Sequence, residues 1–303
     1  MEKLYNEYHL KRLIKYFLIR DKKYTKHPIL EKYSYEIIRR GSDIGTQITL
    51  LNTCTRLMPI AQKEILELDT KSQDLASGKI WIAQSLTHAK GRASRKWWAP
   101  NGGIYMCIAI SPLLLPEHWG LYSIAMGVSI CEALSFWGFS AHIRWINDVL
   151  IDNKKVAGVL SQSFNTPNTL STYILFGIGI NVNITHFPKD ISNIATSLRL
   201  KSNKRLPHMR LTAHVISRII WNFGLTHFWE ARFLNEEISF NPLISSFKRF
   251  SDTIGKKVIF GYDVEKKPEL KALVEDIDQF GRLKLLLKNG QSLVVNAGEI
   301  RYL

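Results

Sequence analysis

Two segments of the chain carry side chains that could bind a nucleotide and an acid. Residues 89–98 form a glycine-containing stretch with four cationic side chains, and the stretch ends in a tryptophan pair. Cationic groups bind phosphate and carboxylate oxygens, and an indole ring packs against a flat base. Further along, Asn147, Asp148 and Lys155 add an amide, a carboxylate and another cation. Together these side chains predict a site that activates an acid with a nucleotide.

A hairpin is expected to position the later residues. Alternating apolar and polar residues predict strands over 149–152 and 156–163, and the Asp152-Asn153 pair between them is typical of a tight turn. Buried strands are expected over 104–110 and 173–182, and a helix over 121–137 that ends at Gly138. Strands and helices therefore mix around the two segments.

The chain divides into three parts by composition. Residues 1–40 contain a basic amphipathic helix, in which apolar residues recur at helical spacing from Leu10 to Leu18. This helix could pack on the main domain, bind nucleic acid or dock a partner, and we find no second helix with a turn glycine after it. Residues 41–248 form the main α+β domain. The short strands expected over 249–303 predict a small SH3-like β-barrel.

Charge and cysteine content limit the kinds of partner and compartment. The 303 residues include 41 Lys and Arg against 26 Asp and Glu, a formal net charge of +15 that favours anionic partners. The three cysteines have no metal-ligand spacing, so we expect no protein metal site and a reducing, cytoplasmic location. We expect no secretory signal, and the apolar stretch 121–139 predicts a buried helix rather than a membrane span.

Several motifs occur in the order and spacing of one known family. From about residue 43 to residue 303, the chain resembles the biotin protein ligases of the biotin/lipoate ligase superfamily. The motifs that carry this resemblance are Ile82-Ala83 with the basic loop 89–98, the loop exit 99–105, Arg144-Trp145-Ile146-Asn147-Asp148, Lys154-Lys155-Val156-Ala157-Gly158, the strand 177–183, Ala195-Thr196-Ser197-Leu198 and Gly298-Glu299-Ile300.

The resemblance implies an enzyme with a two-step reaction. Its fold would be a mixed sheet with flanking helices, followed by the small barrel. The enzyme would use ATP with Mg²⁺ to convert biotin to biotinoyl-AMP. The biotinoyl group would then pass to a lysine of a biotin carboxyl carrier domain. Such carriers are usually acidic, which fits the net charge. The resemblance also implies a possible homodimer, whereas nucleic acid is a less favoured partner.

The resemblance also assigns roles to individual residues. Lys155, Arg92 and Lys90 would be catalytic. Trp98 is expected in the core beneath the loop. The adenylate would be bound by Arg92, Arg95, Trp97, Asn147, Asp148, Gly179 and Asn181. The biotin would be bound by Thr53, Cys54, Thr55, Thr87, Lys90, Gly91, Lys155 and Gly158.

The chain departs from the family pattern mainly where the acid would bind. Ala89-Lys90 replaces the leading Gly-Arg of the loop, Leu86 or Thr87 stands in place of a glutamine, and Ile146 replaces a proline. Two alternatives therefore stay open: a ligase or transferase for another acid, lipoate or octanoate, and a non-catalytic paralogue that binds carrier protein or nucleic acid. The loop 87–98 is expected to be mobile without ligand.

Overall fold

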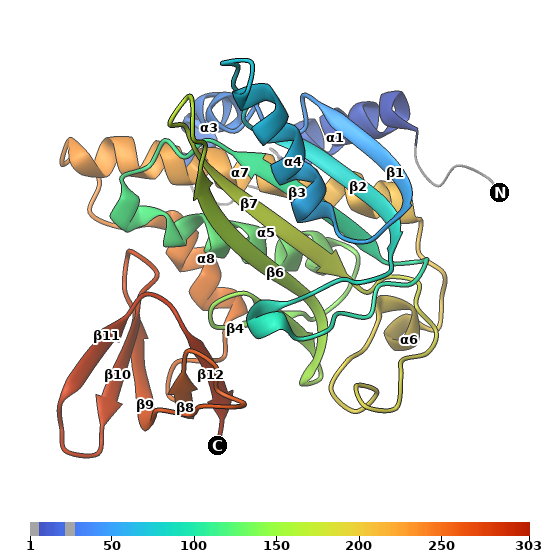
Figure 1. The fold of residues 1–303 in the computed structure, drawn as a ribbon. Helices are drawn as coiled ribbons and strands as arrows, with labels where there is room; N and C mark the ends of the chain where they lie inside the picture. Colours follow the sequence, from blue (N-terminus) through green and yellow to red (C-terminus); the bar gives the residue numbers. More distant parts are fainter. Residues whose placement is uncertain (1–5, 22–27) are drawn as a thin grey trace.

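The computed structural model describes residues 6–21 and 28–303. Of the predicted 1–40 extension, residues 1–5 and 22–27 lie outside the described residues. A mixed sheet with helices on both faces makes up most of the molecule, and a smaller antiparallel sheet lies beside one end of it (Figure 1). The predicted α+β fold class is confirmed.

The large sheet has seven strands within the described residues, in the order β1-β2-β3-β7-β6-β5-β4. Only the β1–β2 pair is parallel, and the other neighbours are antiparallel. The strands are β1 Ile48–Cys54, β2 Lys79–Leu86, β3 Ile104–Ile110, β4 His142–Arg144, β5 Asp148–Ile151, β6 Lys154–Asn165 and β7 Thr172–Ile180. Asp152 and Asn153 form the two-residue turn between β5 and β6, with φ values of 50° and 60°. This left-handed pair matches the predicted hairpin.

Side-chain alternation along β3 explains how the sheet is covered. Ile104, Met106 and Ile108 point into the larger core, which holds α5 (Gly120–Phe136) and α7 (His208–Leu234). The residues between them, such as Tyr105, point to the opposite face and pack in a smaller core with α4 (Leu57–Asp69). The short α6 (Leu198–Ser202) follows β7. The smaller-core face also carries the predicted site segments.

One helical stretch within the described residues, Pro116–Phe136, is long and apolar enough to cross a membrane, with a mean hydropathy of 1.3. However, 67% of this window is buried inside the fold, because α5 packs between the sheet and α7. The stretch therefore serves as a core helix, as the sequence predicted.

The described part of the N-terminal extension packs against the main domain. In α1 (Glu7–Asp21), Leu10 and Phe17 are fully buried in the larger core, whereas Arg12 and Lys15 are exposed. Two short helices, α2 (Pro28–Lys32) and α3 (Ser34–Arg40), follow in the described part of the extension. These helices are too short to show a clear hydrophobic period in the sequence.

The C-terminal part begins after α8 (Pro242–Phe250) and forms a five-stranded antiparallel sheet, consistent with the predicted SH3-like barrel. Its strands are β8 Lys257–Gly261, β9 Leu270–Ile277, β10 Leu283–Leu287, β11 Ser292–Val295 and β12 Glu299–Tyr302. The buried Trp145 Nε1 donates to Gly281 O at 3.1 Å, which ties this sheet to the main domain. Strand β12 pairs with β8 and carries Glu299 at its start.

The α3–α7 crossing should depend on glycine. A Cβ atom at Gly224 would lie 1.9 Å from Ile37 O. The Gly224→Ala variant should lose about 3 kcal/mol of unfolding free energy in urea titration, because two backbones must separate. At Gly120 a Cβ meets nothing within 4 Å, so Gly120→Ala is the matched control. Equal stability of the two variants would contradict this account of the crossing.

Candidate functional site

A cavity of about 740 Å³ lies over the face of β6 and β7, between the loop 89–98 and the C-terminal sheet. This volume is in the range that holds a small-molecule ligand. The structure brings many of the predicted site residues into its lining. These are Lys90, Gly91, Arg92, Arg95, Trp97, Asn147, Asp148, Lys155, Gly158, Gly179 and Asn181.

Backbone hydrogen bonds close the basic loop into a narrow hairpin. Gly91 N–H donates to Arg95 O at 2.7 Å, and Trp97 N–H donates to Ala89 O at 3.0 Å. At the tip, Ala93 has a φ of 52°, a left-handed conformation that glycine adopts more easily. The hairpin directs Arg92, Arg95 and Trp97 into the cavity lining.

Two glycines in neighbouring strands form the floor under Trp97. Gly158 of β6 pairs with Gly179 of β7, and the indole packs against both. A Cβ atom at Gly179 would lie 2.8 Å from Trp97 Nε1, so a larger residue would push the ring away. The Lys155 ammonium lies 5.5 Å from the centre of the same ring, within reach of a cation–π interaction.

The central cation is held by a carboxylate. Lys155 Nζ lies 2.5 Å from Asp148 Oδ1, and Arg144 Nη2 donates to Asp148 Oδ2 at 2.8 Å. Burial by itself would raise the pKa of Asp148, but the charges of Lys155 and Arg144 outweigh it and lower that pKa to about 2. Asp148 is therefore ionised at neutral pH. It holds both cations from its position at the start of β5, in the β5–β6 hairpin.

Two buried polar atoms in the cavity lining have no hydrogen-bond partner among the described residues. They are Trp97 Nε1, a donor, and Asn181 Oδ1, an acceptor. Asn181 Nδ2 already donates to Thr196 O at 3.0 Å, which fixes the direction of the free oxygen. Buried polar atoms are normally paired, so these two are available to a bound ligand. The Asn147 amide nitrogen is less available to a ligand, because Nδ2 donates to Val159 O at 2.5 Å.

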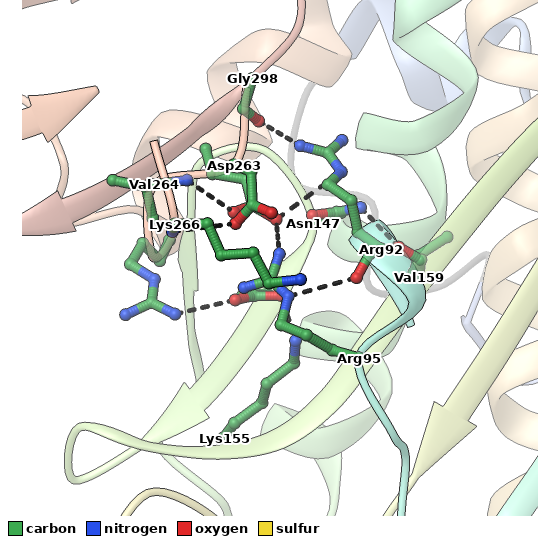
Figure 2. A network of polar contacts seen from close by, with 12 residues as sticks. Arg92, Arg95, Asn147, Lys155, Val159, Asp263, Val264, Lys266 and Gly298 are labelled. Atoms are coloured by element: carbon green, nitrogen blue, oxygen red, sulfur yellow. Dashed lines mark hydrogen bonds and ion pairs between the residues drawn. The ribbon is translucent and has the colours of Figure 1, made fainter. Parts of the chain in front are cut away.

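The C-terminal sheet contributes to the same cavity. Arg92 donates to Gly298 O (Figure 2). Arg95 forms an ion pair with Glu299. The sequence placed Glu299 in a motif of the C-terminal barrel and did not predict that it belongs to the site. Arg144 and Arg56 also line the cavity and were not among the predicted site residues. Arg144 belongs to the sequence motif that contains Asn147-Asp148, but the sequence did not predict its ion pair with Asp148.

Four residues predicted to bind the acid do not line this cavity: Thr53, Cys54, Thr55 and Thr87. The end of β1 runs beside the segment after β2 instead, where Thr53 Oγ1 lies 2.8 Å from Ser85 Oγ and Thr87 N–H donates to Cys54 O. The next residues, Arg56, Leu57 and Met58, reach the cavity because α4 begins there. Burial raises the pKa of the Cys54 thiol, which disfavours a thiolate nucleophile.

The expectation that Trp98 lies in the core was wrong. Trp98 is 40% exposed and lines the cavity rim, whereas Trp97 packs against the sheet. Successive residues of an extended segment point in opposite directions, so only one of the pair can face the glycine floor.

Cations outnumber acids in the described lining, which suits an anionic ligand. The eight cations are Arg56, Lys90, Arg92, Arg95, Lys96, Arg144, Lys155 and Arg301, against Asp148, Glu265 and Glu299. No group of three or more His, Cys, Asp or Glu side chains within the described residues could hold a metal ion.

Comparison with known proteins agrees with the fold and the motifs. A family model described as the biotin/lipoate A/B protein ligase family matches residues 56–181, which include the basic loop, the β5–β6 hairpin and Asn181. The bifunctional ligase/repressor BirA of Bacillus spizizenii is 26% identical over 199 residues. That match covers 62% of this chain and 61% of the relative, less than two thirds of its length.

Two further proteins are similar over more of the chain. The biotin--[acetyl-CoA-carboxylase] ligase of Mycobacterium tuberculosis is 25% identical over 232 residues, which cover 75% of this chain and 79% of that protein. The structure of a biotin protein ligase from Aquifex aeolicus in complex with biotin and ATP superposes with a TM-score of 0.67. It is 22% identical and covers 85% of this chain and 99% of that one, a likeness of fold. In its fold, its ordered motifs and the match over residues 56–181, the chain is similar to the biotin/lipoate A/B protein ligase family.

Proposed function

We propose that the chain is an ATP-dependent biotin protein ligase. It forms biotinoyl-AMP and then transfers the biotinoyl group to a lysine of a biotin carboxyl carrier domain. One observation carries the proposal: Lys155, Trp97 and the Gly158–Gly179 floor meet in one cation-rich cavity. The name of the Mycobacterium tuberculosis relative, a biotin--[acetyl-CoA-carboxylase] ligase, supports biotin as the acid.

The first step needs cations at the reacting phosphate. A carboxylate oxygen of the acid attacks the α-phosphorus of ATP, a new P–O bond forms, and pyrophosphate leaves. Negative charge grows on the phosphate oxygens, and fixed cations lower the barrier. We assign this role to Lys155, and the ion pair that holds its ammonium beside Asp148 in the cavity supports the assignment. Arg92 and Arg95 supply further cations from the loop, with Lys90 at the loop entrance.

The adenine and the acid have different requirements. Trp97 offers a ring face and a free N–H, and Asn181 offers a free carbonyl oxygen for the adenylate. The apolar lining at the start of α4, which includes Met58, and Leu86 in the same lining suit a hydrocarbon chain. Arg56 and Gln62 are the polar side chains available there to a hydrogen-bonding ring. They would replace the partners that the sequence pattern led us to expect at Thr53, Thr55 and Thr87.

The described residues do not fit a protein cage for Mg²⁺. The acids of the cavity are each paired with a cation, and no group of three metal ligands is present among them. Mg²⁺ commonly binds through substrate phosphates and retained water. We therefore expect any Mg²⁺ to enter with ATP rather than to reside in the protein.

The second step joins the acyl group to another protein. The carrier lysine attacks the acyl carbon as a free amine, an amide bond forms, AMP leaves, and the amine loses a proton. An acidic carrier fits the formal net charge of +15, because opposite charges speed encounter. The three free cysteines fit a reducing cytoplasmic compartment. A homodimer would be compatible with this reaction.

The identity of the acid is tested by acid-dependent ATP–pyrophosphate exchange with the purified protein. Biotin should support exchange, while lipoate and octanoate should give little above background. Exchange with lipoate or octanoate but not biotin would assign a different acid. Absence of exchange with all three acids, together with tight binding of a carrier domain, would indicate a non-catalytic paralogue.

Removing the central cation should stop adenylation. Lys155→Ala should lower the exchange rate by about 10²- to 10³-fold, because a fixed charge at the reacting phosphate is lost. Lys154→Ala is the matched control, since Lys154 lies on the same hairpin, donates to Ser192 O and does not line the cavity. Equal exchange rates in the two variants would remove Lys155 from the proposed role.

The glycine floor should control how Trp97 is placed. Gly179→Ala should displace the indole and raise the KM for ATP by roughly tenfold, while thermal unfolding changes little. Gly127→Ala in α5 is the control, because its Cβ would meet only Ile143 at ordinary contact distance. If ATP KM in Gly179→Ala equals that of the wild type, Trp97 does not depend on this floor.

A further inference from the structure

The floor of the cavity has a second hollow beside the one that holds Trp97. Gly177 lies two residues before Gly179 on β7, so both positions face the same side of the sheet. A Cβ atom at Gly177 would lie 2.9 Å from Met58 Sδ and 3.5 Å from Met58 Cγ. The thioether of Met58 therefore occupies the space that a side chain at position 177 would take.

The helix that carries Met58 is tied to the sheet. Met58 is in the first turn of α4, which lies across the smaller-core face of the sheet (Figure 1). On the same helix, the Glu64 carboxylate accepts a hydrogen bond from Trp81 Nε1 of β2 at 3.0 Å. Met58 packs against the smaller core and also lines the cavity. Its backbone position is therefore fixed, while its unbranched side chain can adapt to what lies against it.

The two hollows divide the floor into a nucleotide end and an acid end. Trp97 fills the hollow at Gly179, and the Lys155 ammonium lies 5.5 Å from the centre of its ring. At about 3.3 Å per residue, Gly177 lies about 7 Å further along β7. Several carbon atoms of an extended chain span such a distance. An acid whose carboxylate lies at Lys155 and whose chain follows the strand toward Gly177 would therefore pass over Met58.

The side chains around Met58 are apolar. Leu160 of β6 is paired with Gly177, and its Cβ would lie 3.9 Å from a Cβ atom there. Leu57 and Leu86 belong to the same cavity lining. None of these side chains offers a hydrogen bond, so this part of the cavity can select a ligand only by the shape and size of its apolar groups.

We propose that Met58 is a specificity-determining residue of the acid subsite. Its thioether, seated in the hollow at Gly177, forms the floor under the hydrocarbon chain of the acid and limits the site to unbranched chains. The inference rests on the proposed function, because the acid is a substrate of that reaction. It adds the residue pair, Met58 and Gly177, that sets the depth of the acid end.

The test changes this depth in both directions in the full chain. Met58→Ala removes the thioether and deepens the floor. Gly177→Ala adds a methyl group 2.9 Å from Met58 Sδ, which pushes this flexible side chain up into the cavity. Ile60→Ala is the matched control, because Ile60 lies on α4, packs partly buried against the same core and does not line the cavity. ATP–pyrophosphate exchange is measured with biotin and with a biotin analogue that carries a methyl branch in the middle of its side chain.

Met58→Ala should raise the KM for biotin by about three- to tenfold, because apolar contact with the chain is lost. It should also raise the kcat/KM for the branched analogue relative to that for biotin. Gly177→Ala should raise the KM for biotin as well, but should lower the same ratio. The KM for ATP should stay within about twofold in both variants, since the nucleotide end is unchanged. Ile60→Ala should match the wild type in both KM values and in the ratio.

The double variant Met58→Ala/Gly177→Ala tests whether the two residues act through one contact. It has no thioether left to displace, so its KM for biotin should be lower than the product of the two single effects predicts. An unchanged ratio of branched to unbranched acid in Met58→Ala and Gly177→Ala would overturn the inference, even where both variants bind biotin weakly. Thermal unfolding checks that each variant folds, and Gly177→Ala decides the inference alone if Met58→Ala does not fold.

Failure of the proposed function gives a different result. If the wild-type protein supports no exchange with biotin, lipoate or octanoate, the proposed function fails and the acid subsite fails with it. An active wild-type enzyme whose selectivity is unaffected by both substitutions would remove only the role of Met58.

Discussion

The site depends on the absence of side chains at two neighbouring positions of the large sheet. Gly158 and Gly179 pair across β6 and β7 and leave a hollow that the Trp97 indole fills. Contact with the ring brings the end of the basic loop down onto the sheet. The Lys155 ammonium lies over the same ring, so the hollow also sets the depth at which the central cation is held. A methyl group at Gly179 would disturb all of these contacts together.

Cations that line the cavity are held in ion pairs by two carboxylates. Asp148 orients Lys155 and Arg144, and Glu299 orients Arg92 and Arg95. Cations already held in place need little reorganisation when charge develops on a reacting phosphate. The two carboxylates differ in one respect. Asp148 belongs to the hairpin that carries Lys155, whereas Glu299 reaches the loop from another sheet.

The C-terminal sheet is therefore part of the cavity wall and not a separate appendage. Its contacts with the loop and with Trp145 join residues that lie 206 and 136 positions apart in the chain. The N-terminal helix α1 has a different role in the described structure, since Leu10 and Phe17 complete the core behind the large sheet. Its exposed cationic residues, such as Arg12, add to the formal net charge of +15, which favours anionic partners.

The sequence by itself determined the features that depend on local pattern. Alternating apolar and polar residues predicted strands of both sheets. The Asp152-Asn153 pair predicted the hairpin turn, because a two-residue turn requires residues that accept a left-handed backbone conformation. The order of the motifs predicted that Lys155 and the basic loop share a site, and both line one cavity. Tertiary structure alone decided which of Trp97 and Trp98 faces the sheet, why Arg56 rather than Thr53 reaches the cavity, and that Glu299 pairs with the loop. Those outcomes depend on where each strand ends and on contacts between segments that are distant in the sequence. Residue types and their spacing along the chain do not predict such contacts.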